Sequence, residues 1–386
     1  MNIVPFARRN EKRIVYGLVL VTIVLLLLPL WYVTSVDEEE FRFAVISSVL
    51  HSRALFEGYY PFWTSYFGFG MPHPFLINFN YHPLVFIFAS NADLAINLLY
   101  VLHLLLGSVG IYYLCRLYTG RYLTLLGILS YLMASPNINY LYTDFWPSLF
   151  VGWSLLPLIF YCGLRLAQSQ TISDRKYFAI ALGFLVAMLG LNAHPSQAVV
   201  YVISLLIVLT GCYGDVIKRF NYFILAGVIS VLILAGKFYY LVSEASHFSL
   251  EMVLFKQQFG WDDLWSIFFR PIAFGWPSFV VNYNLDKGSR LLFVGGPLVV
   301  TALATVVWNL RNRNSGQFAL PLIILLSIYV IRPEVLYSFA STLTVWREPV
   351  IILIILVALR GMNELSKGGK LGKSFTYFIS AAQILV

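Results

Sequence analysis

The sequence consists mainly of long apolar runs, many close to the length of about 20 residues that crosses a bilayer as a helix. Of the 386 residues, 59% are hydrophobic and 11% are charged, whereas a soluble domain carries about 25% charged residues. The runs do not alternate between polar and apolar positions as barrel strands do. Because lipid offers backbone groups no hydrogen-bond partners, the runs are predicted to be the helices of an all-α polytopic membrane protein.

About eleven spans are expected along a single transmembrane domain that covers residues 1–386. Their predicted positions are 14–35, 94–116, 121–135, 147–166, 177–192, 196–213, 220–241, 291–309, 317–332, 346–363 and 374–386. The last run stops at Val386 without a flanking charge, which predicts that the chain is truncated here or continues in a longer protein.

Basic residues set the predicted orientation, because Lys and Arg favour the cytoplasmic side of a membrane. With the N-terminus inside and the spans alternating, the inside receives 17 of the 26 Lys and Arg residues. These residues separate the spans and do not cluster on a polar face, so the net charge of +8 does not indicate a nucleic-acid partner. We therefore expect a multi-pass protein of a bacterial or archaeal cytoplasmic membrane, surrounded by membrane lipids, with a cytoplasmic N-terminus.

Two long loops are expected on the extracytoplasmic side, at 36–91 and 243–290. The first opens on an acidic run, and its segment 41–57 has the polar and apolar faces of an amphipathic surface helix. The acidic run has two interpretations: the solvated end of the first span, or the acidic mouth of an active site. If these residues continue a helix, Asp37 and Glu40 share a face and Glu38 points elsewhere.

Several short motifs along the chain are typical of the same kind of protein. Tyr60-Pro61-Phe62-Trp63 and Gly68-Phe69-Gly70-Met71-Pro72 follow the expected surface helix, and Tyr81-His82-Pro83 comes next. Further on, Pro157-Leu158 lies in a span that follows an aromatic outer turn, and Trp346-Arg347-Glu348-Pro349 opens a span. Together these motifs resemble the GT-C superfamily of membrane glycosyltransferases, in particular its YfhO-like and arabinofuranosyltransferase-like branch.

The resemblance implies a GT-C-like helical bundle that acts in the cell envelope. It implies transfer of a sugar from a polyprenyl-phosphate donor to a glycan, lipid or protein acceptor on the extracytoplasmic face. It also implies that the acidic residue after the first span acts as general base or metal ligand, and Asp37 has that place here, with Glu38 next. The donor is then bound from the membrane side, near basic residues of the later outer loops.

A departing lipid phosphate needs cationic help, and Arg suits it because the planar guanidinium donates two hydrogen bonds at once. Arg347 is the preferred residue, since Pro349 suits a helix start, where free backbone N–H groups also attract anions. Arg270, Arg290 and Lys237 are the other candidates. The alternative for a single basic residue at the end of a span is contact with lipid headgroups.

Further outer residues are candidates for binding. His194 lies in a tight turn, either as a substrate ligand or as a hydrogen-bonded turn residue. Trp63 and Tyr60 suit stacking on a sugar ring, although interfacial anchoring is the commoner role of such aromatics. A divalent metal, Mg²⁺ or Mn²⁺, would take carboxylates joined by histidines, and the candidate ligands are Asp37, Asp144, His73 and His82.

The rival interpretation is a lipid or polysaccharide flippase, or a non-catalytic membrane subunit for envelope assembly. A transporter places polar or charged residues at mid-membrane and has interrupted helices. Here the spans are nearly free of charge and polar residues gather at one face, which favours surface chemistry. No Walker motif and no nucleophile elbow is present, so the sequence indicates neither ATP-driven transport nor serine hydrolysis.

Overall fold

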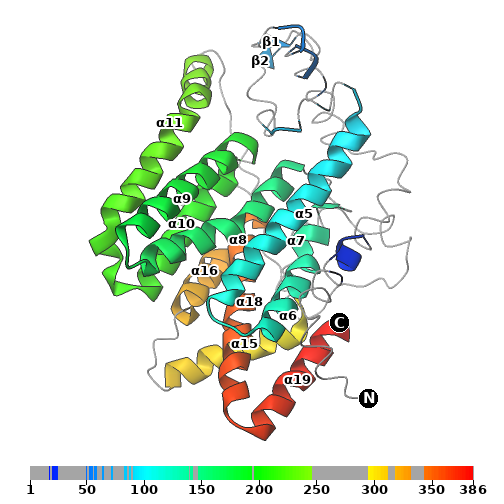
Figure 1. The fold of residues 1–386 in the computed structure, drawn as a ribbon, viewed down its shortest axis with the longest axis vertical. Helices are drawn as coiled ribbons and strands as arrows, with labels where there is room; N and C mark the ends of the chain where they lie inside the picture. Colours follow the sequence, from blue (N-terminus) through cyan, green and yellow to red (C-terminus); the bar gives the residue numbers. More distant parts are fainter. Residues whose placement is uncertain are drawn as a thin grey trace.

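The computed structural model describes residues 17, 20–24, 49, 52–54, 56–58, 63–64, 71–72, 82–84, 87, 90–138, 140–141, 147–193, 195–245, 294–311, 318–331 and 343–385. Within these residues the chain forms a bundle of long helices. One small hairpin lies at the top of Figure 1, toward the same end of the bundle as the upper end of α11. The hairpin pairs β1 (Trp63–Thr64) with β2 (Met71–Pro72) in antiparallel fashion, with Trp63 opposite Pro72.

The helices follow the expected spans. In chain order they are α5 (Ala92–Arg116), α6 (Arg121–Leu132), α7 (Ser135–Ile138), α8 (Pro147–Gln168), α9 (Ile172–Asn192), α10 (Pro195–Cys212), the 3₁₀ helix η3 (Gly214–Arg219), α11 (Phe220–Ala245), α15 (Gly296–Arg311), α16 (Ala319–Ile331), α18 (Leu343–Lys367) and α19 (Lys370–Leu385). Each span predicted from 94–116 onward coincides with a helix over most of its length. The expected all-helical bundle is therefore confirmed for this part of the chain.

Four of the described helices are long and apolar enough to cross a bilayer: Leu94–Arg116, Pro147–Gln168, Phe220–Lys237 and Val345–Lys367. Three shorter apolar helices, Ser196–Cys212, Gly296–Arg311 and Ala319–Ile331, accompany them. These helices identify a membrane protein with helical spans. The total of about eleven spans stays a prediction.

The starts of α9 and α18 are among those that differ from the sequence expectation. α9 begins at Ile172, five residues before the expected 177, because the Thr171 side chain accepts a hydrogen bond from the Asp174 backbone N–H at 3.1 Å and caps the helix. α18 begins at Leu343, so the expectation that Pro349 marks its start is wrong. Pro349 lies inside the helix, where a membrane environment tolerates proline because neighbouring helices satisfy the freed backbone groups.

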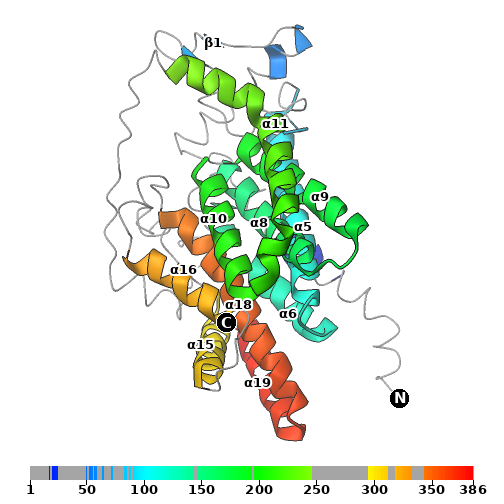
Figure 2. The same cartoon turned by 90° about the vertical axis from the view of Figure 1, so that its left-hand side faces the viewer.

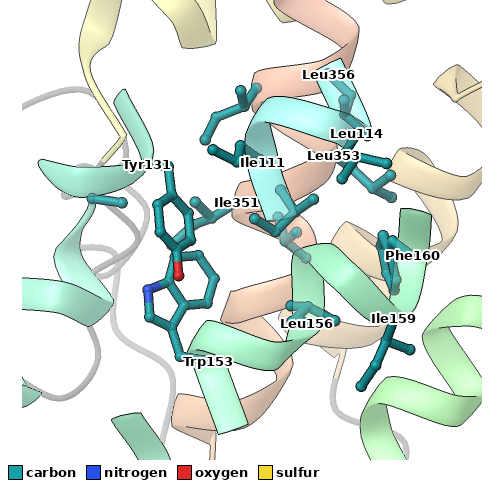
Figure 3. Packing of buried hydrophobic residues seen from close by; sticks show 14 of the residues in the cluster. Ile111, Leu114, Tyr131, Trp153, Leu156, Ile159, Phe160, Ile351, Leu353 and Leu356 are labelled. Atoms are coloured by element: carbon teal, nitrogen blue, oxygen red, sulfur yellow. The ribbon is translucent and has the colours of Figure 1, made fainter. Parts of the chain in front are cut away.

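α8 lies at the centre of the bundle and α11 at its edge (Figures 1 and 2). Of the apolar segment of α8, 83% is buried, against 17% for α11. Around α8 one hydrophobic cluster joins side chains of α5, α8 and α18, among them Ile111, Phe160 and Leu353 (Figure 3). α5, α9 and α10 therefore all pack on α8.

A set of polar side chains ties together helix ends that carry basic residues. The Tyr118 and Tyr213 hydroxyls lie 2.9 Å apart, and the Gln168 amide donates to Tyr118 at 3.1 Å. Asn363 of α18 donates to the Tyr118 backbone carbonyl at 3.2 Å. The ends of α5, α8 and α10 therefore meet α18 at one place.

Candidate functional site

The largest polar assembly in the described part of the chain surrounds the carboxylate of Glu348, near the start of α18. The Tyr140 and Tyr201 hydroxyls each donate a hydrogen bond to one of its oxygens. The Gln197 amide donates to the second oxygen at 3.1 Å. Together with Arg347, these residues form what we call the Glu348 cluster: Tyr140, Gln197, Tyr201, Arg347 and Glu348.

Three separate chain segments build the cluster. Tyr140 follows the short helix α7, while Gln197 and Tyr201 stand four residues apart on α10 and therefore share a face. This spacing also brings the Gln197 amide within 3.1 Å of the Tyr201 hydroxyl. Tyr140, Gln197, Tyr201 and Glu348 are all fully buried, with 0% of their surface exposed. A buried carboxylate needs such donors, because burying it without partners costs several kcal/mol.

Arg347 brings a positive charge to the same place. Its side chain is fully buried, and its guanidinium carbon lies 5.5 Å from the centre of the Tyr140 ring. A cation over an aromatic face is attracted by the ring quadrupole, most strongly where water is excluded. Burial, and secondly the charge of Glu348, raise the pKa of the Tyr140 phenol well above its ordinary value of 10, so Tyr140 remains a donor.

A stacked aromatic pair from α6 and α8 lies near the Glu348 cluster. The Trp153 ring of α8 stacks on Tyr131 of α6, with centroids 4.8 Å apart and planes inclined by 19° (Figure 3). Its indole N–H donates to Asn137 at 2.9 Å. Asn137 in turn donates to the backbone carbonyls of Tyr131 and Leu132 at the C-terminal end of α6. The Tyr131 carbonyl also accepts from the Ala134 backbone N–H at 3.2 Å.

α8 contributes backbone to the cluster as well as packing. The Gln197 amide donates to the Leu149 carbonyl at 2.8 Å, although Leu149 lies within the helix. Gly152, one turn further along, leaves the room that Gln197 occupies, since a Cβ there would lie 2.1 Å from the Gln197 amide oxygen. The absence of a side chain at Gly152 is therefore a requirement of the cluster.

A second buried polar group, the histidine chain, consists of His82, His103 and Ser154. The two imidazole Nε2 atoms lie 3.1 Å apart, and His103 Nδ1 lies 2.5 Å from the Ser154 hydroxyl. The Leu84 backbone N–H donates to His82 Nδ1 at 3.2 Å. His103 belongs to α5 and Ser154 to α8, so the chain joins a turn of the first predicted loop to two central helices.

Lys237, a candidate for phosphate binding, caps a neighbouring helix. Its ammonium donates to the carbonyls of Gly190 and Leu191 at 2.9 and 3.0 Å, at the C-terminal end of α9. A cation suits this position because the helix dipole is negative there and the last carbonyls lack partners. Phosphate binding by Lys237 stays a prediction.

The structure places only some of the predicted site residues. Arg347, Lys237 and His82 are described, and each contacts a different set of partners. For Trp63 the backbone is described, in β1. The remaining predicted residues lie outside the described part of the chain: Asp37, Glu38, Tyr60, His73, Asp144, His194, Arg270 and Arg290.

The described residues do not by themselves assemble a metal site, since no group of three His, Cys, Asp or Glu side chains is found among them. His82, one of the four predicted ligands, has both ring nitrogens in hydrogen bonds, to Leu84 and to His103. Mg²⁺ or Mn²⁺ binding through Asp37, Asp144 and His73 stays a prediction.

Sequence reasoning passed over most residues that form these two groups. Glu348 is adjacent to Arg347, but an expected phosphate ligand favours the cation over the carboxylate. Gln197, Tyr201, His103 and Ser154 are polar residues inside apolar runs, which is itself a signal, because such groups are expensive within a membrane. Comparisons with protein-family models, curated proteins and solved structures give no match to this chain.

Proposed function

We propose that this protein is a membrane glycosyltransferase that moves a sugar from a polyprenyl-phosphate donor to a glycan, lipid or protein acceptor on the extracytoplasmic face. One observation carries the proposal: residue 140 of a predicted outer segment and the outer ends of two predicted spans, at 197–201 and 347–348, converge on the Glu348 cluster. Ionisable and polar residues within membrane spans are costly, so their convergence supports a functional site there.

The opposite end of the bundle supports the same orientation. Tyr118, Gln168, Tyr213 and Asn363, which the basic-residue pattern places inside, are joined by hydrogen bonds. Polar contacts therefore gather near both ends of the helices, and the packing between them is mainly apolar apart from the histidine chain. An outer polar end next to lipid is where a lipid-linked sugar and a polar acceptor can meet.

The chemistry divides between two regions. Asp37, or Glu38 in second place, would take the proton from the acceptor hydroxyl as the general base. The donor phosphate would lie at the outer end of α18, where Arg347 favours an anion. Because Arg347 is fully buried, its charge is weakly screened by water and acts over a longer distance. A metal held by Asp37, Asp144 and His73 would add further positive charge there, whereas both ring nitrogens of His82 are already in hydrogen bonds.

Buried ionisable groups support a second candidate function, that of a flippase. Arg347, Glu348 and His103 all lie inside the bundle, and charged or titratable side chains at depth are typical of transport pathways. A transporter moves the lipid-linked sugar across the bilayer and leaves its glycosyl bond intact, whereas a transferase breaks that bond. The two functions are therefore separable in one vesicle preparation.

The experiment uses the protein in proteoliposomes with a radiolabelled polyprenyl-phosphate sugar and a mixture of glycan and lipid acceptors. We expect sugar transfer by the wild type and a loss of at least 100-fold in the double variant Asp37→Asn, Glu38→Gln, about the effect of removing a general base. Glu364→Gln is the matched control, because that carboxylate is exposed and pairs only with the nearby Lys367 among the described residues.

Two results would overturn the proposal. Translocation of the intact donor without transfer would assign the protein to the flippases. Full transfer by the double variant would remove both carboxylates from the mechanism.

A further inference from the structure

The hydrogen bonds of the histidine chain can run from donor to acceptor in one direction only. The Leu84 backbone N–H is a donor, so His82 Nδ1 must accept and the neutral ring carries its proton on Nε2. That proton is donated to His103 Nε2, which leaves the His103 proton on Nδ1, facing the Ser154 hydroxyl. Ser154 then donates to the Val151 carbonyl at 2.8 Å. Every donor in the chain meets an acceptor.

This direction separates the histidine chain from a serine nucleophile. An activated serine donates its proton to a neighbouring base, whereas Ser154 accepts from His103 and donates to a backbone carbonyl. The reverse direction would place a proton on His82 Nδ1 against the Leu84 N–H. The chain is therefore built to hold parts of the protein together.

The parts that it holds lie far apart in the sequence. His103 is the twelfth residue of α5, so its Cα lies about 16 Å along the helix from the first residue. His82 and Leu84 thus reach well below the start of α5, and His82 is only 5% exposed. The turn at residues 82–84 therefore packs against the bundle at this depth.

The same two turns of α8 serve both polar groups. Ser154 holds the histidine chain, while Leu149 and Gly152 hold Gln197 of the Glu348 cluster. Gly152 and Ser154 are two residues apart and therefore face roughly opposite sides of the helix. A rotation or shift of α8 would move both groups together.

We propose that His103 and Ser154 are positioning residues that fix the end of the first outer loop to α8, in register with the Glu348 cluster. The link to catalysis rests on the proposed function, because that function assigns the loop its reacting carboxylates. The anchoring of the turn at residues 82–84 does not depend on it.

The test measures the position of the turn directly. Pro83 is exposed, as is Leu98 on α5, so spin labels at Pro83→Cys and Leu98→Cys report the distance between the turn and the helix. The background replaces the three native cysteines, Cys115, Cys162 and Cys212, by alanine. Pulsed electron paramagnetic resonance in lipid nanodiscs then gives the distance distribution.

We expect His103→Gln and Ser154→Ala to broaden this distribution, and Ser154→Thr, which keeps the hydroxyl, to retain the wild-type width. Ser108→Ala is the matched control: it removes a buried serine from α5 whose hydroxyl, among the described residues, bonds to the Leu104 carbonyl. In the transfer assay, His103→Gln and Ser154→Ala should lower kcat about tenfold or more, with the donor KM within about twofold, since misplaced reacting groups affect the chemical step.

The outcomes separate the two proposals. Wild-type distributions in both His103→Gln and Ser154→Ala would overturn the anchor. Broadened distributions in a protein that shows no transfer would uphold the anchor and reject the glycosyltransferase. Broadening with unchanged kcat in an active enzyme would show that the anchor does not position the reacting groups, and would overturn that part of the inference.

Discussion

Gly152 of α8 and Gln197 of α10 are in such close contact that one additional carbon atom at Gly152 would lie 2.1 Å from the Gln197 amide oxygen. Gln197 has little freedom to move away, because its amide nitrogen is bound to the Leu149 carbonyl and to Glu348. The contact therefore links helix packing to the buried carboxylate.

Gly152→Ala should lower the free energy of unfolding by about 1–3 kcal/mol, the range for an overpacked core. Thermal unfolding in detergent micelles measures the effect. The control is Gly227→Ala on α11, where a Cβ would meet nothing within 4 Å and alanine favours the helix by about 1 kcal/mol. Equal melting temperatures for the two variants would contradict the close contact.

The hydrogen bonds of the Glu348 cluster predict which substitutions destabilise the fold most. Tyr201→Phe removes one donor to the carboxylate and should destabilise the fold by about 1–3 kcal/mol. Glu348→Ala leaves Arg347 without its neighbouring charge and two buried phenols without their acceptor, for which we expect about 3–5 kcal/mol. Tyr239→Phe is the control, because Tyr239 is 79% exposed. A Glu348→Ala variant as stable as the wild type would show that the carboxylate has no structural role.

The capping of α9 by Lys237 gives a third prediction. Lys237→Met keeps the length of the side chain and removes the charge at the Gly190 and Leu191 carbonyls, which should destabilise the protein by about 0.3–2 kcal/mol. Lys367→Met removes an exposed lysine and should have almost no effect. If Lys237 instead binds the donor phosphate, Lys237→Met will raise the donor KM while the melting temperature stays the same.

His82 makes stability depend on pH. Burial lowers the pKa of His82 from 6.5 to about 4 in the folded protein. The unfolded chain therefore binds more protons between these values, so this contribution to stability is complete above pH 6.5 and is lost as the pH falls toward about 4.

The melting temperature should thus fall between pH 7 and pH 5 by more in the wild type than in His82→Gln, which has no titrating ring. Identical pH profiles for the two proteins would show that His82 does not control this range.

The sequence was sufficient to predict the helices from residue 94 onward that the structure describes, because length and apolarity determine where a chain crosses a membrane. It missed the early start of α9, since the charged residues 174–176 resemble a loop until Thr171 is recognised as a cap. It also misjudged Pro349, which reads as a helix start but lies within α18. At α9 the local hydrogen bond of the Thr171 cap outweighs the average preference of the charged residues that follow it.

The candidate site was harder to predict than the fold. Arg347 and Glu348 are neighbours on a helix, and their side chains point about 100° apart, so only the packing of α10 and Tyr140 decides which one is surrounded by donors. His103 and Ser154 are ordinary polar residues until the rotation of α5 against α8 is known. The predicted roles of Asp37 and Glu38 stay predictions, because those residues lie outside the described part of the chain.

The contrast between α8 and α11 has a consequence for the way this protein can evolve. Nearly every position of α8 touches another helix, whereas most of the apolar segment of α11 faces outward. Sequence drift should accordingly gather on α11, where any apolar side chain will serve. Substitutions in α8 will persist only when changes on its neighbours accompany them.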